Sequence, residues 1–187
     1  MAGSFAVDSD VTLLLETGLV YTLGNLVQVD LTVNGTLLLQ PGVTIEFPGF
    51  YDDLIVNDTL LAQGTDQDSI RFIGTNATST THGGKVRLTG TSTGSVIEYA
   101  EFDQMGDVNT GSVASLWIST SDATIGNVRI TDSETSGLYI DNGSSPSLGV
   151  MEIQGGNKGI EIADGSPAIS GSVITGATTH GILITNG

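Results

Sequence analysis

The chain has 187 residues, the size of a single domain and enough to bury a continuous core. Its formal net charge is −16 with only 5 Lys and Arg residues, so no basic stripe exists to neutralise nucleic-acid phosphates or an anionic membrane. It has no cysteine, which excludes disulfides and thiolate metal sites, and no apolar stretch of the roughly 18 residues that a membrane helix needs.

The N-terminal part, residues 1–30, contains the short strand-like segments 11–15 and 20–23, which we expect to cap the first coil of a repeat. The repeat begins at residue 31. Leu31-Thr-Val-Asn-Gly-Thr-Leu recurs as Leu54-Ile-Val-Asn-Asp-Thr-Leu, 23 residues later. Asn34 and Asn57 end equivalent strands, where an amide can hydrogen-bond the neighbouring turn. We predict that the two asparagines stack on each other.

Two longer segments, 75–84 and 103–114, interrupt the repeat after Phe72 and Phe102. Because both follow the same strand of the coil, we expect them to leave one edge of the molecule, one above the other. Long loops on a rigid scaffold often carry binding residues. Tolerated insertions are the alternative interpretation, and the sequence favours it.

The second half of the chain repeats every 22 residues. Apolar positions alternate with variable ones in the blocks Ser115-Leu-Trp-Ile, Gly137-Leu-Tyr-Ile, Gly159-Ile-Glu-Ile and Gly181-Ile-Leu-Ile. A fixed period with one strand in each copy is typical of a solenoid. We therefore predict a single-stranded parallel β-helix of about seven coils over residues 31–187. We expect its C-terminal end to continue into, or be covered by, more protein, because an unpaired strand edge exposes backbone polar groups.

Outward-facing charges alternate in sign along the second strand of successive coils: Glu46, Arg71, Glu101, Arg129 and Glu152. Opposite charges on neighbouring strands stabilise the pairing by roughly 0.2–1 kcal/mol each. We interpret this column as a structural ladder that fixes the register of the coils. A polar sugar-binding strip is the alternative.

A second outward column, at the variable position of the 22-residue blocks, contains Arg87, Trp117, Tyr139 and Glu161. Arg87 is placed to lie over Trp117 as a cation–π pair. Exposed aromatic rings flanked by a carboxylate can stack on a sugar and bind its hydroxyls, so these four residues are the candidate glycan site. The alternative is that loop residues cover the rings.

Acidic residues gather in early turns, among them Asp52, Asp53, Asp66 and Asp68. Calcium takes six to eight oxygen ligands, which such turns can supply, although the sequence has no EF-hand spacing and solvated turn acids are the simpler interpretation. No other cofactor is indicated. We find no catalytic motif. Lys85 or Arg87 acting as the base of a calcium-dependent lyase is a low-ranking alternative.

The repeats resemble those of a known family. Leu31-Thr-Val-Asn-Gly-Thr-Leu with Pro41-Gly-Val-Thr-Ile-Glu-Phe is similar to the first coils of β-helix proteins on microbial surfaces. Ser144-Ser-Pro-Ser-Leu and Gly165-Ser-Pro-Ala-Ile look like pectin-lyase-like repeats of carbohydrate-binding and sugar-hydrolase (CASH) type. This resemblance and the handedness rule for parallel crossovers imply a right-handed coil.

The resemblance, together with the lack of a catalytic motif in the sequence, leads us to expect a non-catalytic module of a secreted or cell-surface protein. Its expected role is that of a rigid spacer or adhesin that binds glycans or another surface protein, with no nucleic acid and no membrane insertion. The substrate platform of a polysaccharide lyase or hydrolase is the alternative, because one fold serves many functions.

Overall fold

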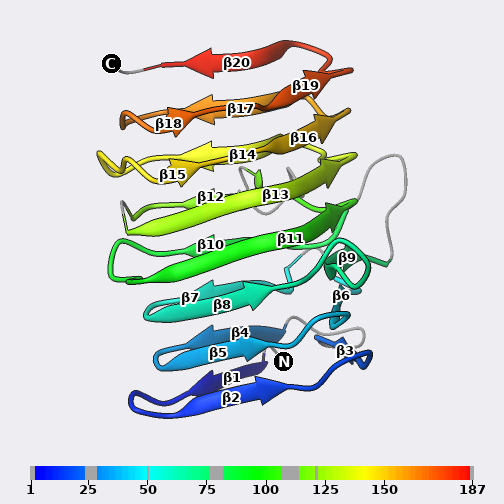
Figure 1. Cartoon of the computed structure of the whole chain (residues 1–187), viewed down its shortest axis with the longest axis vertical. Helices are drawn as coiled ribbons and strands as arrows, with labels where there is room; N and C mark the ends of the chain where they lie inside the picture. Colours follow the sequence, from blue (N-terminus) through cyan, green and yellow to red (C-terminus); the bar gives the residue numbers. More distant parts are fainter. Residues whose placement is uncertain are drawn as a thin grey trace.

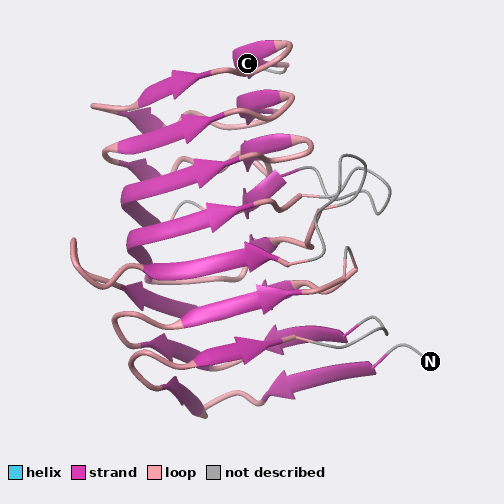
Figure 2. Ribbon diagram, turned by 90° about the vertical axis from the view of Figure 1, so that its right-hand side faces the viewer, coloured by secondary structure: helices cyan, strands magenta, loops and turns pink. Residues whose placement is uncertain are grey.

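The computed structural model describes residues 3–23, 29–49, 51–75, 82–106, 114–120 and 122–185. These residues form strands, turns and loops without a helix, and the strands stack in parallel as a β-solenoid of about seven turns (Figures 1 and 2). The coils follow one another in chain order, from β1 and β2 at one end to β20 at the other (Figure 1). The predicted all-β parallel solenoid is confirmed.

One side of the solenoid is a parallel sheet to which each coil contributes one strand. Its order along the stack is β1 (Gly3–Val7), β4 (Val29–Val33), β7 (Leu54–Val56), β10 (Val86–Leu88), β12 (Ala114–Ile118), β14 (Ser136–Ile140), β17 (Lys158–Ile162) and β20 (His180–Ile184). We call it the first sheet. Trp117 pairs with Tyr139, and Tyr139 with Glu161, so the 22-residue period is confirmed as the distance between neighbouring rungs.

The remaining strands form the second sheet, which is bent. Its longer part contains β2 (Thr12–Leu15), β5 (Thr36–Leu39), β8 (Thr59–Gln63), β11 (Ser95–Asp103), β13 (Ala123–Thr131), β15 (Ser147–Leu148) and β18 (Ala168–Ile169). Beyond the bend lie β3 (Val20–Thr22), β6 (Thr44–Phe47), β9 (Ile70–Gly74), β16 (Met151–Gln154) and β19 (Val173–Thr175). β11 and β13 cross the bend through Tyr99 and Asn127, whose φ angles of 48° and 52° turn the strand.

The core lies between the two sheets and consists of stacked Leu, Ile, Val and Phe side chains. It follows directly from the alternation seen in the sequence, because every second residue of a strand points inward. Phe72 and Phe102 are fully buried and stack with their ring centroids 4.7 Å apart. The two segments that follow these residues are only partly described, since residues 76–81 and 107–113 lie outside the described part, so their predicted exit at one edge stays a prediction.

Polar side chains at the ends of the first sheet's strands hydrogen-bond from coil to coil and form a polar ladder. Asn57 Nδ2 donates to Asn34 Oδ1 at 2.8 Å, and Thr89 Oγ1 donates to Asn57 Oδ1 at 3.1 Å. Between the next two coils, Ser119 Oγ donates to Asp141 Oδ1 at 2.6 Å. The predicted stacking of the asparagines is confirmed. The interaction continues through Thr89, because a hydroxyl can replace an amide as donor.

The described strands of the expected N-terminal cap, residues 1–30, stack on the coil that follows them. β1 pairs with β4, β2 with β5 and β3 with β6, so residues 3–23 form a complete first coil. This coil is not recognisable as a repeat in the sequence, because β1 precedes β4 by 26 residues and shares only the apolar alternation with the later copies. The end coils expose apolar side chains, among them Phe5 at 59% and Ile184 at 63%.

Candidate functional site

The charge ladder lies on the outer surface of the second sheet. Arg71, Glu101, Arg129 and Glu152 occupy paired positions on β9, β11, β13 and β16. Arg71 Nε lies 3.3 Å from Glu101 Oε2, and Arg129 Nε lies 3.8 Å from Glu152 Oε2. These side chains are about half exposed, so each pair contributes at most about 1 kcal/mol and leaves hydrogen-bonding groups available to a ligand.

Glu46 does not belong to this ladder. It pairs with Ile73, and Thr44 is the residue opposite Arg71. Its carboxylate instead accepts a hydrogen bond from Thr22 Oγ1 at 2.9 Å. The predicted alignment was two residues out of register. Such a shift keeps every side chain on its own face of the sheet, whereas a shift of one would exchange the faces, so alternation alone cannot detect it.

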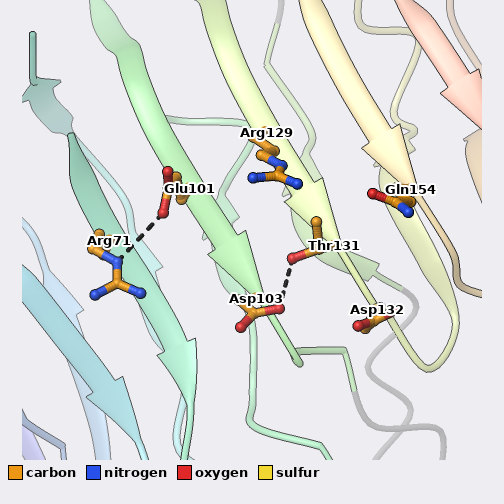
Figure 3. A pocket seen from close by; sticks show the side chains of 7 residues that line it. All are labelled: Arg71, Glu101, Asp103, Arg129, Thr131, Asp132 and Gln154. Atoms are coloured by element: carbon orange, nitrogen blue, oxygen red, sulfur yellow. Dashed lines mark hydrogen bonds and ion pairs between the residues drawn. The ribbon is translucent and has the colours of Figure 1, made fainter. Parts of the chain in front are cut away.

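A hollow of about 360 Å³ opens beside the ladder. We call it the charged groove. The residues that line it are all polar or charged and come from four neighbouring strands and the turn after β13 (Figure 3): Arg71, Glu101, Asp103, Arg129, Thr131, Asp132 and Gln154. The groove brings two guanidinium groups, three carboxylates, a hydroxyl and an amide together on one surface.

The sequence interpretation missed the second row of this groove. Asp103, Thr131 and Gln154 pair across β11, β13 and β16, each two residues beyond a member of the ladder. Thr131 Oγ1 donates to Asp103 Oδ1 at 2.6 Å, which fixes the carboxylate (Figure 3). Asp132 has a φ of 51° at the start of the turn and is exposed. The available signal was the spacing: residues two apart in a strand share a face.

The predicted aromatic column exists on the outer surface of the first sheet. Arg87, Trp117, Tyr139 and Glu161 are paired in that order along the stack. The guanidinium carbon of Arg87 lies 4.0 Å from the centroid of the Trp117 ring, so the predicted cation–π pair is confirmed. Tyr139 meets Trp117 edge-on, with the centroids 5.4 Å apart and the ring planes at 86°.

This packing limits what the column can do as a sugar platform. The Trp117 ring has Arg87 on one neighbouring rung and Tyr139 on the other, and its Nε1 atom is buried without a hydrogen-bond partner among the described residues.

Burial raises the pKa of the Tyr139 phenol, and the nearby carboxylates of Asp141 and Glu161 raise it further. Ser136 Oγ and Lys158 Nζ both donate to Glu161 Oε2, at 2.9 and 2.7 Å.

The four aspartates considered for calcium are not brought together. Asp52 accepts the backbone N–H groups of Val29 and Gly49, at 2.8 and 2.7 Å. Asp53 is paired with Lys85, while Asp66 and Asp68 are exposed in the turn after β8. Within the described part of the chain, no three His, Cys, Asp or Glu residues form a metal-binding group. Burial raises the pKa of Asp52 and of Asp53.

Lys85 is poorly placed to act as the base of a lyase. Its side chain is 11% exposed, and its Nζ contacts Asp53 Oδ2 at 2.5 Å. Nearby, His82 Nδ1 lies 3.6 Å from Glu134 Oε2, with both side chains mostly buried. A general base must reach the proton that it removes, so a polymer lying on the outside of the solenoid would not meet Lys85 in this arrangement.

Comparison of the chain with family models, with curated proteins and with solved structures finds no match. No helix in the described ranges is long and apolar enough to cross a membrane. The fold and the geometry of the two outer surfaces are therefore the basis for the functional interpretation.

Proposed function

We propose that the chain is a rigid, non-catalytic β-solenoid module of a secreted or cell-surface protein, related to the pectin-lyase-like repeats, which binds a glycan in the charged groove. The supporting observation is the groove itself: an open hollow of about 360 Å³ lined by polar and charged residues. Functional sites of this fold are side-chain constellations placed on a common scaffold, so the site decides the function.

A glycan suits the chemistry of this lining. Sugar hydroxyls donate and accept hydrogen bonds, and the groove offers guanidinium and amide donors beside carboxylate acceptors. Its two cations face three carboxylates, which leaves little net charge at this spot of a chain whose total is −16. A strongly anionic polymer would be repelled by the molecule as a whole, so we propose a neutral or weakly charged glycan.

The scaffold supports the role of a rigid spacer. Each coil pairs with its neighbours through both sheets, and the side chains inside form one continuous cluster along the stack. In such a solenoid every repeat contacts only adjacent repeats, and the outward residues are free to vary. The groove therefore holds its residues at the strand spacing of about 4.8 Å without depending on a mobile loop.

The experiment is a glycan array followed by titration calorimetry with the best ligand. The test variant is Asp132→Ala/Gln154→Ala, which removes two exposed groove side chains that make no ion pair in the described structure. We expect affinity to fall by about tenfold or more, the effect of losing one or two net hydrogen bonds. Trp117→Ala is the matched control on the other sheet and should leave affinity unchanged.

Two outcomes would contradict the proposal. If the folded wild-type protein binds no glycan, only the spacer role remains. If Trp117→Ala abolishes binding while the groove variant does not, the glycan binds to the aromatic column. The alternative, a substrate platform of a polysaccharide lyase, is tested by incubation with uronic-acid polymers and calcium, where new ultraviolet absorbance from unsaturated products would support it.

A further inference from the structure

Lys85 and Asp53 form a close pair between neighbouring rungs of the first sheet. They immediately precede Val86 and Leu54, which pair in β10 and β7. Lys85 Nζ lies 2.5 Å from Asp53 Oδ2, and the two side chains are only 11% and 15% exposed. The backbone N–H of Lys85 donates to the other carboxylate oxygen, Oδ1, at 3.1 Å. The amine therefore faces one oxygen while an N–H group holds the other.

The surroundings keep this pair away from water. A side chain at Gly84 would approach within 2.7 Å of Asp53 Oδ1 and within 1.9 Å of the Asp52 carbonyl oxygen, so only glycine lets the backbone pack directly on the carboxyl group. On the other side, Asp30 Oδ1 accepts the backbone N–H of Asp53 at 3.2 Å. Burial raises the pKa of Asp53 even beside a lysine, and the charge of Asp30 acts in the same direction.

We propose that Lys85 and Asp53 condense spontaneously to an isopeptide bond that covalently joins two rungs of the solenoid. This inference does not depend on glycan binding. It rests on three observations: Lys85 Nζ contacts Asp53 Oδ2, the backbone N–H of Lys85 donates to Oδ1 of the same carboxyl group, and both side chains are mostly buried. Together these provide the proximity and the desolvation that amide formation requires.

The reaction balances without a further reagent. Transfer of one proton from the Lys85 ammonium to the Asp53 carboxylate within the contact gives the amine and the carboxylic acid that react. The Nζ lone pair attacks Cγ of Asp53, and the negative charge that develops on Oδ1 is stabilised by the N–H of Lys85. The Cγ–Oδ2 bond then breaks, Oδ2 leaves as water with the proton from Nζ, and the Nζ–Cγ amide remains.

The second described lysine ion pair lacks these features and serves as an internal control. Lys158 Nζ lies 2.7 Å from Glu161 Oε2, but the lysine is 27% exposed and the pair lies within a single strand. The same carboxylate oxygen is also held by Ser136. A bond there would not join two rungs, and the lysine is more open to water than Lys85.

The test is the intact mass of the purified, folded wild-type chain followed by tryptic mapping. We expect a mass lower than the sequence mass by one water. We also expect a branched peptide in which residues 1–71 are joined to residues 72–87, uncut at Lys85. Lys158→Arg should keep both features, and Lys85→Arg should restore the full mass. Asp53→Ala provides a second variant if Lys85→Arg fails to fold, with folding followed by circular dichroism.

Two results would overturn the proposal. One is the full sequence mass in wild-type protein whose circular dichroism shows the folded β-structure. The other is a missing water that maps to residues 159–187, because Asp164 precedes Gly165 and can lose water by forming a succinimide there. In that second case the loss of water would persist in Lys85→Arg.

Discussion

Replacing Phe102 with alanine tests whether the stacked core is the source of stability. Phe102 is fully buried, lies 4.7 Å from the Phe72 ring and pairs with Ile130 on the next rung. Removing a buried phenylalanine costs about 3–5 kcal/mol in free energy of unfolding. Urea unfolding measures this loss and is followed by the fluorescence of Trp117, which is the single tryptophan of the chain and lies in the next coil. The control is Phe5→Ala at the exposed end, which should cost much less.

A double-mutant cycle then isolates the contact between the two rings. Phe72→Leu, Phe102→Leu and the double variant keep most of the core volume but remove the aromatic pair. We expect a coupling of about 0.5–1.5 kcal/mol beyond the burial of area. A loss below about 1 kcal/mol for Phe102→Ala, or strictly additive leucine variants, would refute the stacking of these rings between rungs.

Three further predictions concern polar groups on the outside of the coils. The pKa of Tyr139 is raised above 10.0 in the folded protein, so its contribution to stability is complete below that pH and is lost as the pH rises through the folded pKa. Tyr139→Phe should remove the phenolate that forms last in an ultraviolet titration. The same variant should remove the fall in urea stability over that pH range. Asn57→Ala removes two side-chain hydrogen bonds in the polar ladder and should cost about 1–3 kcal/mol in urea unfolding, whereas an unchanged midpoint would contradict the ladder. Arg129→Gln breaks a half-exposed pair with Glu152 and should cost less than about 1 kcal/mol, an effect that high salt removes; a larger, salt-independent loss would show that the pair is not screened.

The repeat period and the core could be predicted from sequence because both depend on alternation. Every second residue of a strand must face the interior, and equivalent residues of successive rungs must coincide. These two conditions were enough to place Trp117 beside Tyr139 and to stack Asn34 with Asn57, which the structure confirms. The contact of Arg87 with Trp117 followed from the same register.

The errors arose where alternation gives no information. Glu46 keeps its outward direction in either of two registers, so the sequence could not show that it lies opposite Ile73. The first coil has the same alternation but no recognisable repeat of the later blocks, so the sequence does not reveal that β1 pairs with β4. The bend of the second sheet at Tyr99 and Asn127 and the hollow beside the charge ladder are features that a strand pattern does not reveal.

The division between inward and outward residues also explains why the fold is clear while function must be tested. The inward positions are constrained on both neighbouring rungs, so they accept only apolar residues of suitable size. An outward residue has the same two neighbours but is open to solvent. Its identity changes the fold little and changes the surface completely. Arg129 and Thr131 belong to one strand and one groove, yet neither is needed for the core. Candidate functional residues on this scaffold are therefore outward residues that share a face, and in the charged groove such residues also line a hollow.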